Sequence, residues 1–96
     1  VGPGLAAFGV PGTLPDPVLQ IFDANNRIVI ANDNWHQGTL VTELRAATAL
    51  VGGFALPDNS RDAAVIISLD PGAYTAQIVD SAGRSGVSLV EVYEVP

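Results

Sequence analysis

Short apolar runs alternate with clusters of turn-forming residues along most of the chain. Residues 18–22 and 27–31 are rich in Val, Ile and Leu, and they flank the stretch Asp23-Ala24-Asn25-Asn26. Asn and Asp tolerate left-handed backbone conformations and bond to their own backbone, so this stretch favours a tight turn. The pattern predicts a β-hairpin at this point.

The second half of the chain repeats this pattern. Residues 64–69, 73–79 and 87–95 read as three further strands, and Asp70-Pro71-Gly72 between the first two has the residues of a type II turn. Five or six short strands, with turns every 8–12 residues, are typical of an antiparallel sandwich. The predicted fold class is therefore all-β: an antiparallel, jelly-roll-like β-sandwich.

One segment departs from the β pattern. Leu40, Leu44, Ala47 and Val51 follow helical spacing and share one helical face. We therefore expect one short helix around residues 39–50, with Thr39 as a cap and Gly52-Gly53 at its end.

Composition excludes several classes of protein. The chain has 96 residues, ten acids against four Arg, a net charge of −6 and no Cys. The sequence has no basic patch for nucleic acid, no thiol for a disulfide or a Cys-ligated zinc site, and no apolar run that spans a membrane. We expect residues 1–96 to form a single β-sandwich repeat unit of a longer chain.

Oxygen-bearing side chains gather next to the predicted strands. Ca²⁺ binds six to eight oxygens, of which two or three usually come from carboxylates. The alternative is that these Asn and Asp residues only form turns. The candidate metal ligands are Asp16, Asp23, Asn25, Asn32, Asp33 and Asp62.

The single Trp and the single His follow one of these clusters. Trp35 offers an aromatic face on which a sugar would stack, or alternatively it anchors its loop to the core. His36 lacks a recognisable nucleophile context, and a small sandwich offers little cleft for a pair of catalytic carboxylates. We expect no catalytic residues and no enzyme activity, with Trp35 as the candidate ligand-binding residue.

Several motifs carry a resemblance to a known family. The strand Asp16-Pro17-Val18-Leu19-Gln20-Ile21, the loop Asn32-Asp33 and the strand Pro71-Gly72-Ala73-Tyr74-Thr75 occur in the order found in bacterial pre-peptidase C-terminal domains. The chain thus resembles the tandem β-sandwich repeats of large secreted bacterial proteins, and it is similar to the repeat units of calcium-stabilised extracellular filaments. The segments that carry the resemblance are residues 1–10, 16–23, 32–35, 62–64, 71–77 and 90–94.

The resemblance implies a non-catalytic module outside the cell, secreted or on the cell surface. Asp16, Asn32, Asp33 and Asp62 match the polar positions of its motifs. We therefore expect a structural subunit of an extracellular bacterial filament or surface protein, stabilised by Ca²⁺, with neighbouring copies of the domain as partners. The alternative is a carbohydrate-binding accessory module of a secreted enzyme, with a glycan as its ligand.

Overall fold

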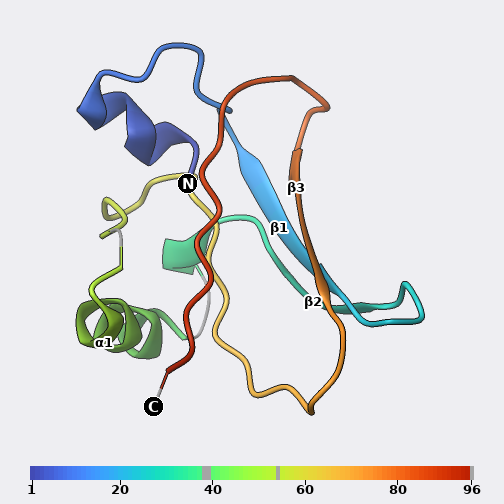
Figure 1. Cartoon of the computed structure of the whole chain (residues 1–96). Helices are drawn as coiled ribbons and strands as arrows, with labels where there is room; N and C mark the ends of the chain where they lie inside the picture. Colours follow the sequence, from blue (N-terminus) through green and yellow to red (C-terminus); the bar gives the residue numbers. More distant parts are fainter. Residues whose placement is uncertain (38–39, 54, 96) are drawn as a thin grey trace.

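Three strands form one antiparallel sheet in the order β2-β1-β3 (Figure 1). The computed structural model describes residues 1–37, 40–53 and 55–95. Strand β1 (Pro17–Phe22) lies in the centre and pairs with β2 (Ile28–Asn32) and with β3 (Thr75–Asp80). The small sheet thus joins the N-terminal quarter of the chain to a strand more than fifty residues away.

The predicted hairpin is confirmed as β1 and β2. The Oδ1 of Asp23 accepts hydrogen bonds from the backbone N–H groups of Asn25 (2.9 Å) and Arg27 (3.0 Å). Asn26 takes the left-handed conformation, with φ of 59°. The turn therefore forms through the side-chain bonding that favours Asp and Asn at such positions.

The predicted helix is also confirmed, as α1 (Val41–Val51). It ends where Gly52 takes a left-handed φ of 67° and the N–H of Gly53 bonds to the carbonyl of Thr48 at 3.0 Å. The proposed cap, Thr39, lies outside the described residues. Two short 3₁₀ helices are also present in the described residues, η1 (Pro3–Phe8) and η2 (Trp35–Gln37).

Few large apolar side chains are buried in the part of the chain that the structure describes. Leu5, Leu14, Trp35 and Leu44 are buried, and the indole Nε1 of Trp35 donates to the carbonyl of Pro57 at 3.0 Å. The guanidinium of Arg45 lies 5.5 Å from the centre of the Trp35 ring. Trp35 thus anchors the segment after β2 to the interior.

A buried carboxylate ties the N-terminal helix to the rest of the fold. Asp62 is fully buried, and its oxygens accept hydrogen bonds from the N–H groups of Gly2 (2.7 Å) and Gly4 (3.1 Å) and from the hydroxyl of Ser60 (2.7 Å). Its carbonyl accepts from the N–H of Trp35 at 2.9 Å. Gly2 has no room for a side chain, since a Cβ there would collide with the carbonyl oxygen of Leu14.

The predicted strand at residues 73–79 is confirmed as β3, whereas the predicted strands at residues 64–69 and 87–95 do not form within the described residues. Residues 64–69 and 87–95 run as traces without strand arrows in Figure 1; they join no sheet, and Val87 makes only an isolated bridge to Thr13. A strand needs a hydrogen-bonded neighbour as well as apolar side chains. The structure therefore shows a three-stranded antiparallel sheet with one α-helix, and it does not show a second sheet or a sandwich.

The prediction of a type II turn at Asp70-Pro71-Gly72 is wrong. That turn requires a positive φ at Gly72, and the left-handed glycines are Gly9, Gly12, Gly52 and Gly83. Instead, the hydroxyl of Tyr74 donates to the carbonyl of Asp70 at 2.7 Å.

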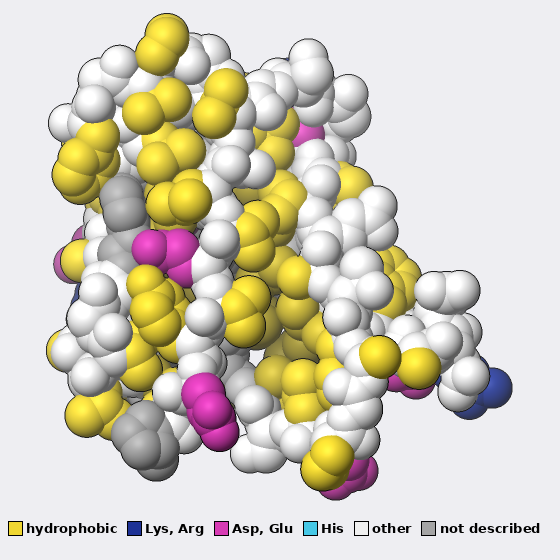
Figure 2. Space-filling model, viewed as in Figure 1, with side chains coloured by type: hydrophobic (Ala, Val, Ile, Leu, Met, Phe, Trp, Pro, Cys, Tyr) yellow, Lys and Arg dark blue, Asp and Glu magenta, His cyan; other side chains and the backbone are white. Residues whose placement is uncertain are grey.

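A long groove separates the sheet from the remaining elements. Figure 2 shows the hollow, lined by hydrophobic side chains. One side is the sheet face that carries Leu19 and Ile78, and the other side is formed by α1 together with residues 63–69 and 89–95.

We predict that Asp62→Ala destabilises the domain by about 2–4 kcal/mol, because it leaves the buried N–H groups of Gly2 and Gly4 without acceptors. Urea unfolding measures the change. The matched control is Asp58→Ala, which removes an exposed carboxylate paired with Arg45 and is expected to cost less than about 1 kcal/mol. Equal losses for the two variants would contradict a central role for Asp62.

Candidate cation site

Three acidic residues lie at one end of the sheet. Asp16 precedes β1, Asp33 follows β2 and Asp80 is the last residue of β3. Because both neighbours run antiparallel to β1, the start of β1 and the ends of β2 and β3 lie at the same end of the sheet. The fold therefore gathers carboxylates that are far apart in sequence.

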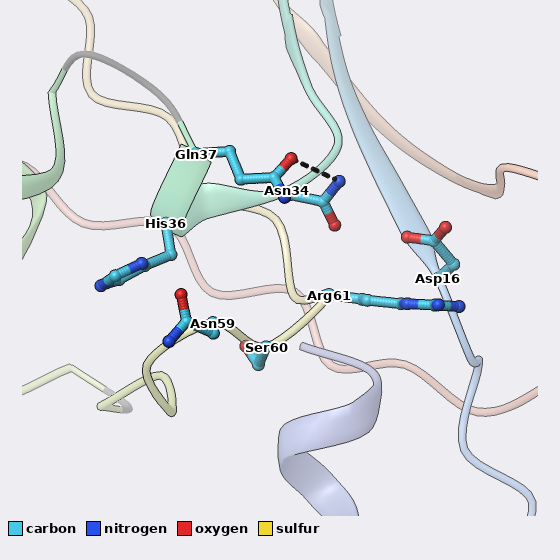
Figure 3. A pocket seen from close by; sticks show the side chains of 7 residues that line it. All are labelled: Asp16, Asn34, His36, Gln37, Asn59, Ser60 and Arg61. Atoms are coloured by element: carbon cyan, nitrogen blue, oxygen red, sulfur yellow. Dashed lines mark hydrogen bonds between the residues drawn. The ribbon is translucent and has the colours of Figure 1, made fainter.

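A polar pocket of about 350 Å³ opens beside this end of the sheet (Figure 3). The 3₁₀ helix η2 and the loop that precedes Asp62 contribute most of its wall. Arg61 extends across the pocket towards Asp16. The residues that line it are Asp16, Asn34, His36, Gln37, Asn59, Ser60 and Arg61.

Asp16 is held in place by the end of β3. Its N–H donates to Oδ1 of Asp80 at 3.1 Å, and its Oδ2 accepts from the hydroxyl of Ser81 at 2.7 Å. Its other oxygen, Oδ1, is buried and has no hydrogen-bond partner among the described residues. A buried carboxylate oxygen without a donor is unfavourable unless a proton or a cation approaches it.

Asp33 is an acidic neighbour of Asp16. Partial loss of hydration raises the pKa of its carboxyl group, Asp16 raises that pKa further by hydrogen bonding and by repulsion, and Arg61 opposes the shift. A hydrogen bond between two carboxyl groups requires a proton on one of them. Asp33 is an exposed residue, so solvent screens these effects.

The carboxylate of Asp80, in contrast to Oδ1 of Asp16, is surrounded by hydrogen-bond donors. Its Oδ2 accepts from the N–H of Ala82 (2.9 Å) and from the N–H (3.2 Å) and Nε (2.9 Å) of Arg84. The side-chain bond from Arg84 is the main reason that the pKa of Asp80 falls to about 2. Asp80 therefore stays ionised and supports the turn that positions Asp16.

The six proposed ligands do not form a single site. Asp16, Asn32 and Asp33 lie at the end of the sheet where β1 begins, whereas Asp23 and Asn25 belong to the turn at the other end of β1. The oxygens of Asp23 and Asp62 already accept the backbone bonds described for the hairpin and for Gly2 and Gly4.

Asn32 also has a protein partner. Its Oδ1 accepts from the N–H of Ala64 at 3.1 Å. Asp16 and Asp33 remain as the pair whose oxygens a cation would satisfy. Among residues 1–37, 40–53 and 55–95, no three His, Cys, Asp or Glu side chains come together as a metal-binding group.

Trp35 and His36 lie beside the pocket in structural roles. Trp35 is only 3% exposed, so its ring packs in the interior. The His36 ring meets the Trp35 ring edge-on, with centroids 5.2 Å apart, and its Nε2 lies 3.0 Å from a guanidinium nitrogen of Arg45. Arg45 also pairs with Asp58 at 2.6 Å.

Sequence reasoning missed Asp80, Ser81 and Arg61 as parts of this site. The stretch Asp80-Ser81-Ala82-Gly83 reads as a turn, and it is one, with Gly83 at a φ of 74°. Only the pairing of β1 with β3 brings this turn to Asp16. That long-range pairing has no local signal in the sequence.

Comparisons of the chain with models of protein families, with characterised proteins and with solved structures found no match. Within the described residues, none of the helices has the length and apolar character needed to cross a membrane.

We predict that acid destabilises the domain through Asp80. A carboxyl whose pKa is lowered to about 2 in the fold, against about 3.9 when unfolded, stabilises the fold at higher pH. This stabilisation is present above about pH 4 and is lost as the pH falls through about 2. Urea unfolding across this range measures it for the wild type and for Asp80→Asn. An equally steep acid dependence in the variant would contradict the assignment.

We predict that the fluorescence of Trp35 is weakly quenched by acrylamide and unchanged by soluble glycans, because the ring is buried. Free tryptophan serves as the fully exposed reference. Strong quenching, or a glycan-dependent change in emission, would support the carbohydrate-binding alternative.

Proposed function

We propose that this chain is a non-catalytic structural module of an extracellular bacterial filament or surface protein, and that Ca²⁺ bound at Asp16 and Asp33 stabilises it. The observation that carries the proposal is the buried Oδ1 of Asp16, which lacks a hydrogen-bond donor and belongs to a side chain that interacts with the carboxyl group of Asp33. A cation between the two acids would satisfy that oxygen and remove their repulsion.

The chemistry of the surroundings suits a hard cation. Ca²⁺ accepts carboxylate, carbonyl, carboxamide and water oxygens in flexible geometry, so two carboxylates suffice when neutral oxygens complete the shell. Asn34 donates its amide nitrogen to Gln37 at 3.4 Å, which leaves its amide oxygen directed away from Gln37 (Figure 3). Arg61 is the competing positive charge, because its guanidinium opposes the rise in the pKa of Asp33.

The position of the pair supports a mechanical role. A cation held by Asp16 and Asp33 would join the start of β1 to the end of β2, and the bonds from Asp80 and Ser81 extend this link to β3. All three strands would then be cross-linked at one end of the sheet. A domain with few buried apolar side chains gains most from such a brace.

An extracellular location and association with neighbouring copies follow from the resemblance described above, and the acidic composition is compatible with both. Ten acids against four Arg give a surface that attracts divalent cations. The carbohydrate-binding alternative gains no support from Trp35, since that ring is buried.

We predict that Ca²⁺ raises the thermal midpoint of the domain and that Asp16→Asn and Asp33→Asn each abolish the rise. At 100 times the dissociation constant, binding to the folded state adds about 2.7 kcal/mol, which corresponds to about 10 °C or more in a domain of this size. Calorimetry with calcium and then with a chelator measures it.

Two comparisons sharpen this test. Asp23→Asn changes a carboxylate at the other end of β1, so it should retain the calcium-dependent rise. Arg61→Gln removes the competing charge and should increase calcium affinity. Because the pKa of Asp33 is raised, protons compete for the site, and the effect of calcium should weaken as the pH falls. An unchanged midpoint in wild-type protein would remove the cation from the proposal.

A further inference from the structure

The chain contains two Asp-Pro bonds, and they lie in opposite environments. Pro17, the first residue of β1, is fully buried behind Asp16. Asp70 and Pro71 are both exposed, in the loop that leads into β3 at the bottom of the view in Figure 1. The bond to a proline is a tertiary amide. Because the ring nitrogen is more basic than an ordinary amide nitrogen, it leaves more readily when the bond is attacked.

The carbonyl group of Asp70 has a side-chain donor. The hydroxyl of Tyr74 donates to its oxygen at 2.7 Å. The ring of Tyr74 reaches this oxygen across Gly72, where an added Cβ would lie 3.7 Å from the ring and 4.0 Å from the oxygen. A donor at this place stabilises the negative charge that develops on the oxygen when a nucleophile attacks the carbonyl carbon. Tyr74 therefore acts on the bond between Asp70 and Pro71 as an oxyanion donor.

The nucleophile belongs to the same residue as the carbonyl. The carboxylate of Asp70 is exposed, and among the described residues it has no hydrogen-bond or ion-pair partner. Aspartate carboxylates act as nucleophiles in enzymes. Attack on the carbonyl carbon of its own residue closes a five-membered ring, which gives the reaction the advantage of proximity.

The carboxylate at the other Asp-Pro bond is not free. Oδ2 of Asp16 accepts from the hydroxyl of Ser81 at 2.7 Å, and Oδ1 is buried. The carbonyl of Asp16 also has a donor, the N–H of Ser81 at 2.9 Å. The two bonds therefore differ in the freedom of the carboxylate and in access to water, and only the one at Asp70 combines all the groups that cleavage requires.

We propose that the chain cleaves itself between Asp70 and Pro71. An oxygen of the Asp70 carboxylate bonds to the Asp70 carbonyl carbon, and the hydroxyl of Tyr74 stabilises the resulting oxyanion. The bond from this carbon to the nitrogen of Pro71 then breaks, and the nitrogen takes a proton from the solvent. Water hydrolyses the cyclic anhydride left at Asp70, which gives a C-terminal aspartic acid and a new N-terminal proline. The inference does not depend on the cation site.

Cleavage would leave the two fragments associated. Strand β3 pairs with β1 over six residues, from Pro17 with Asp80 to Phe22 with Thr75. The N–H and the carbonyl of Val87 are both bonded to residues 12–14 at 2.8 Å. The cut would therefore replace the covalent connection into β3 by the hydrogen bonds of the sheet, and the fragments would separate only when the domain unfolds.

The test incubates the purified 96-residue chain at about pH 5, where Asp80 still stabilises the fold, and in urea at the same pH. Mass spectrometry measures the appearance of fragments 1–70 and 71–96. We expect cleavage after Asp70 to be about tenfold or more faster in the folded chain than in urea. Cleavage after Asp16 should be slower in the folded chain than in urea, so the two bonds should respond to folding in opposite directions.

Matched variants test the roles of the two side chains. Tyr74→Phe removes the donor and should lower the rate in the folded chain about tenfold, without changing the rate in urea. Tyr93→Phe removes the other tyrosine hydroxyl, which donates to Glu91, and should leave the rate unchanged. Asp70→Glu keeps the charge but requires a larger ring, so it should be cleaved far more slowly than the wild type. Circular dichroism confirms that the variants are folded.

Three results would overturn the proposal. One is cleavage after Asp70 that is no faster in the folded chain than in urea, and another is a wild-type rate in Tyr74→Phe. The third is a rate that rises with protein concentration or persists in Asp70→Glu, which would assign the cut to a contaminating protease. Addition of calcium or of a chelator should leave the rate unchanged, which separates this outcome from the fate of the cation site.

Discussion

The buried carboxylate of Asp62 is the interaction on which the rest of the structure depends. Removing a charge from water is costly, and only direct hydrogen bonds offset that cost. Asp62 receives them from Gly2, Gly4 and Ser60, so it can satisfy its oxygens only when η1, the loop before it and the segment of Trp35 are all in place. Few apolar side chains are buried here, and a polar junction therefore fixes how these segments pack.

Three aspartates near this junction show how donors decide the role of one residue type. Asp62 and Asp80 are surrounded by backbone and side-chain donors, and both stabilise turns or loops through those hydrogen bonds. Asp16 has one oxygen bonded to Ser81 and the other buried without a donor. The number of hydrogen-bond donors around each carboxylate therefore distinguishes Asp62 and Asp80, which stabilise the fold, from Asp16, which is the candidate metal ligand.

Local features of the fold were predictable from sequence, and long-range pairings were not. The hairpin of β1 and β2 and the helix α1 depend on neighbours within a few residues, such as Asp23 with Arg27 and Thr48 with Gly53. Residues 64–69 and 87–95 have the apolar content of strands, but strand formation depends on a partner that sequence does not reveal. The same limit applied to the site: Asp16 and Asp33 were recognisable as oxygen donors, whereas Asp80, Ser81 and Arg61 reach them only through the tertiary fold.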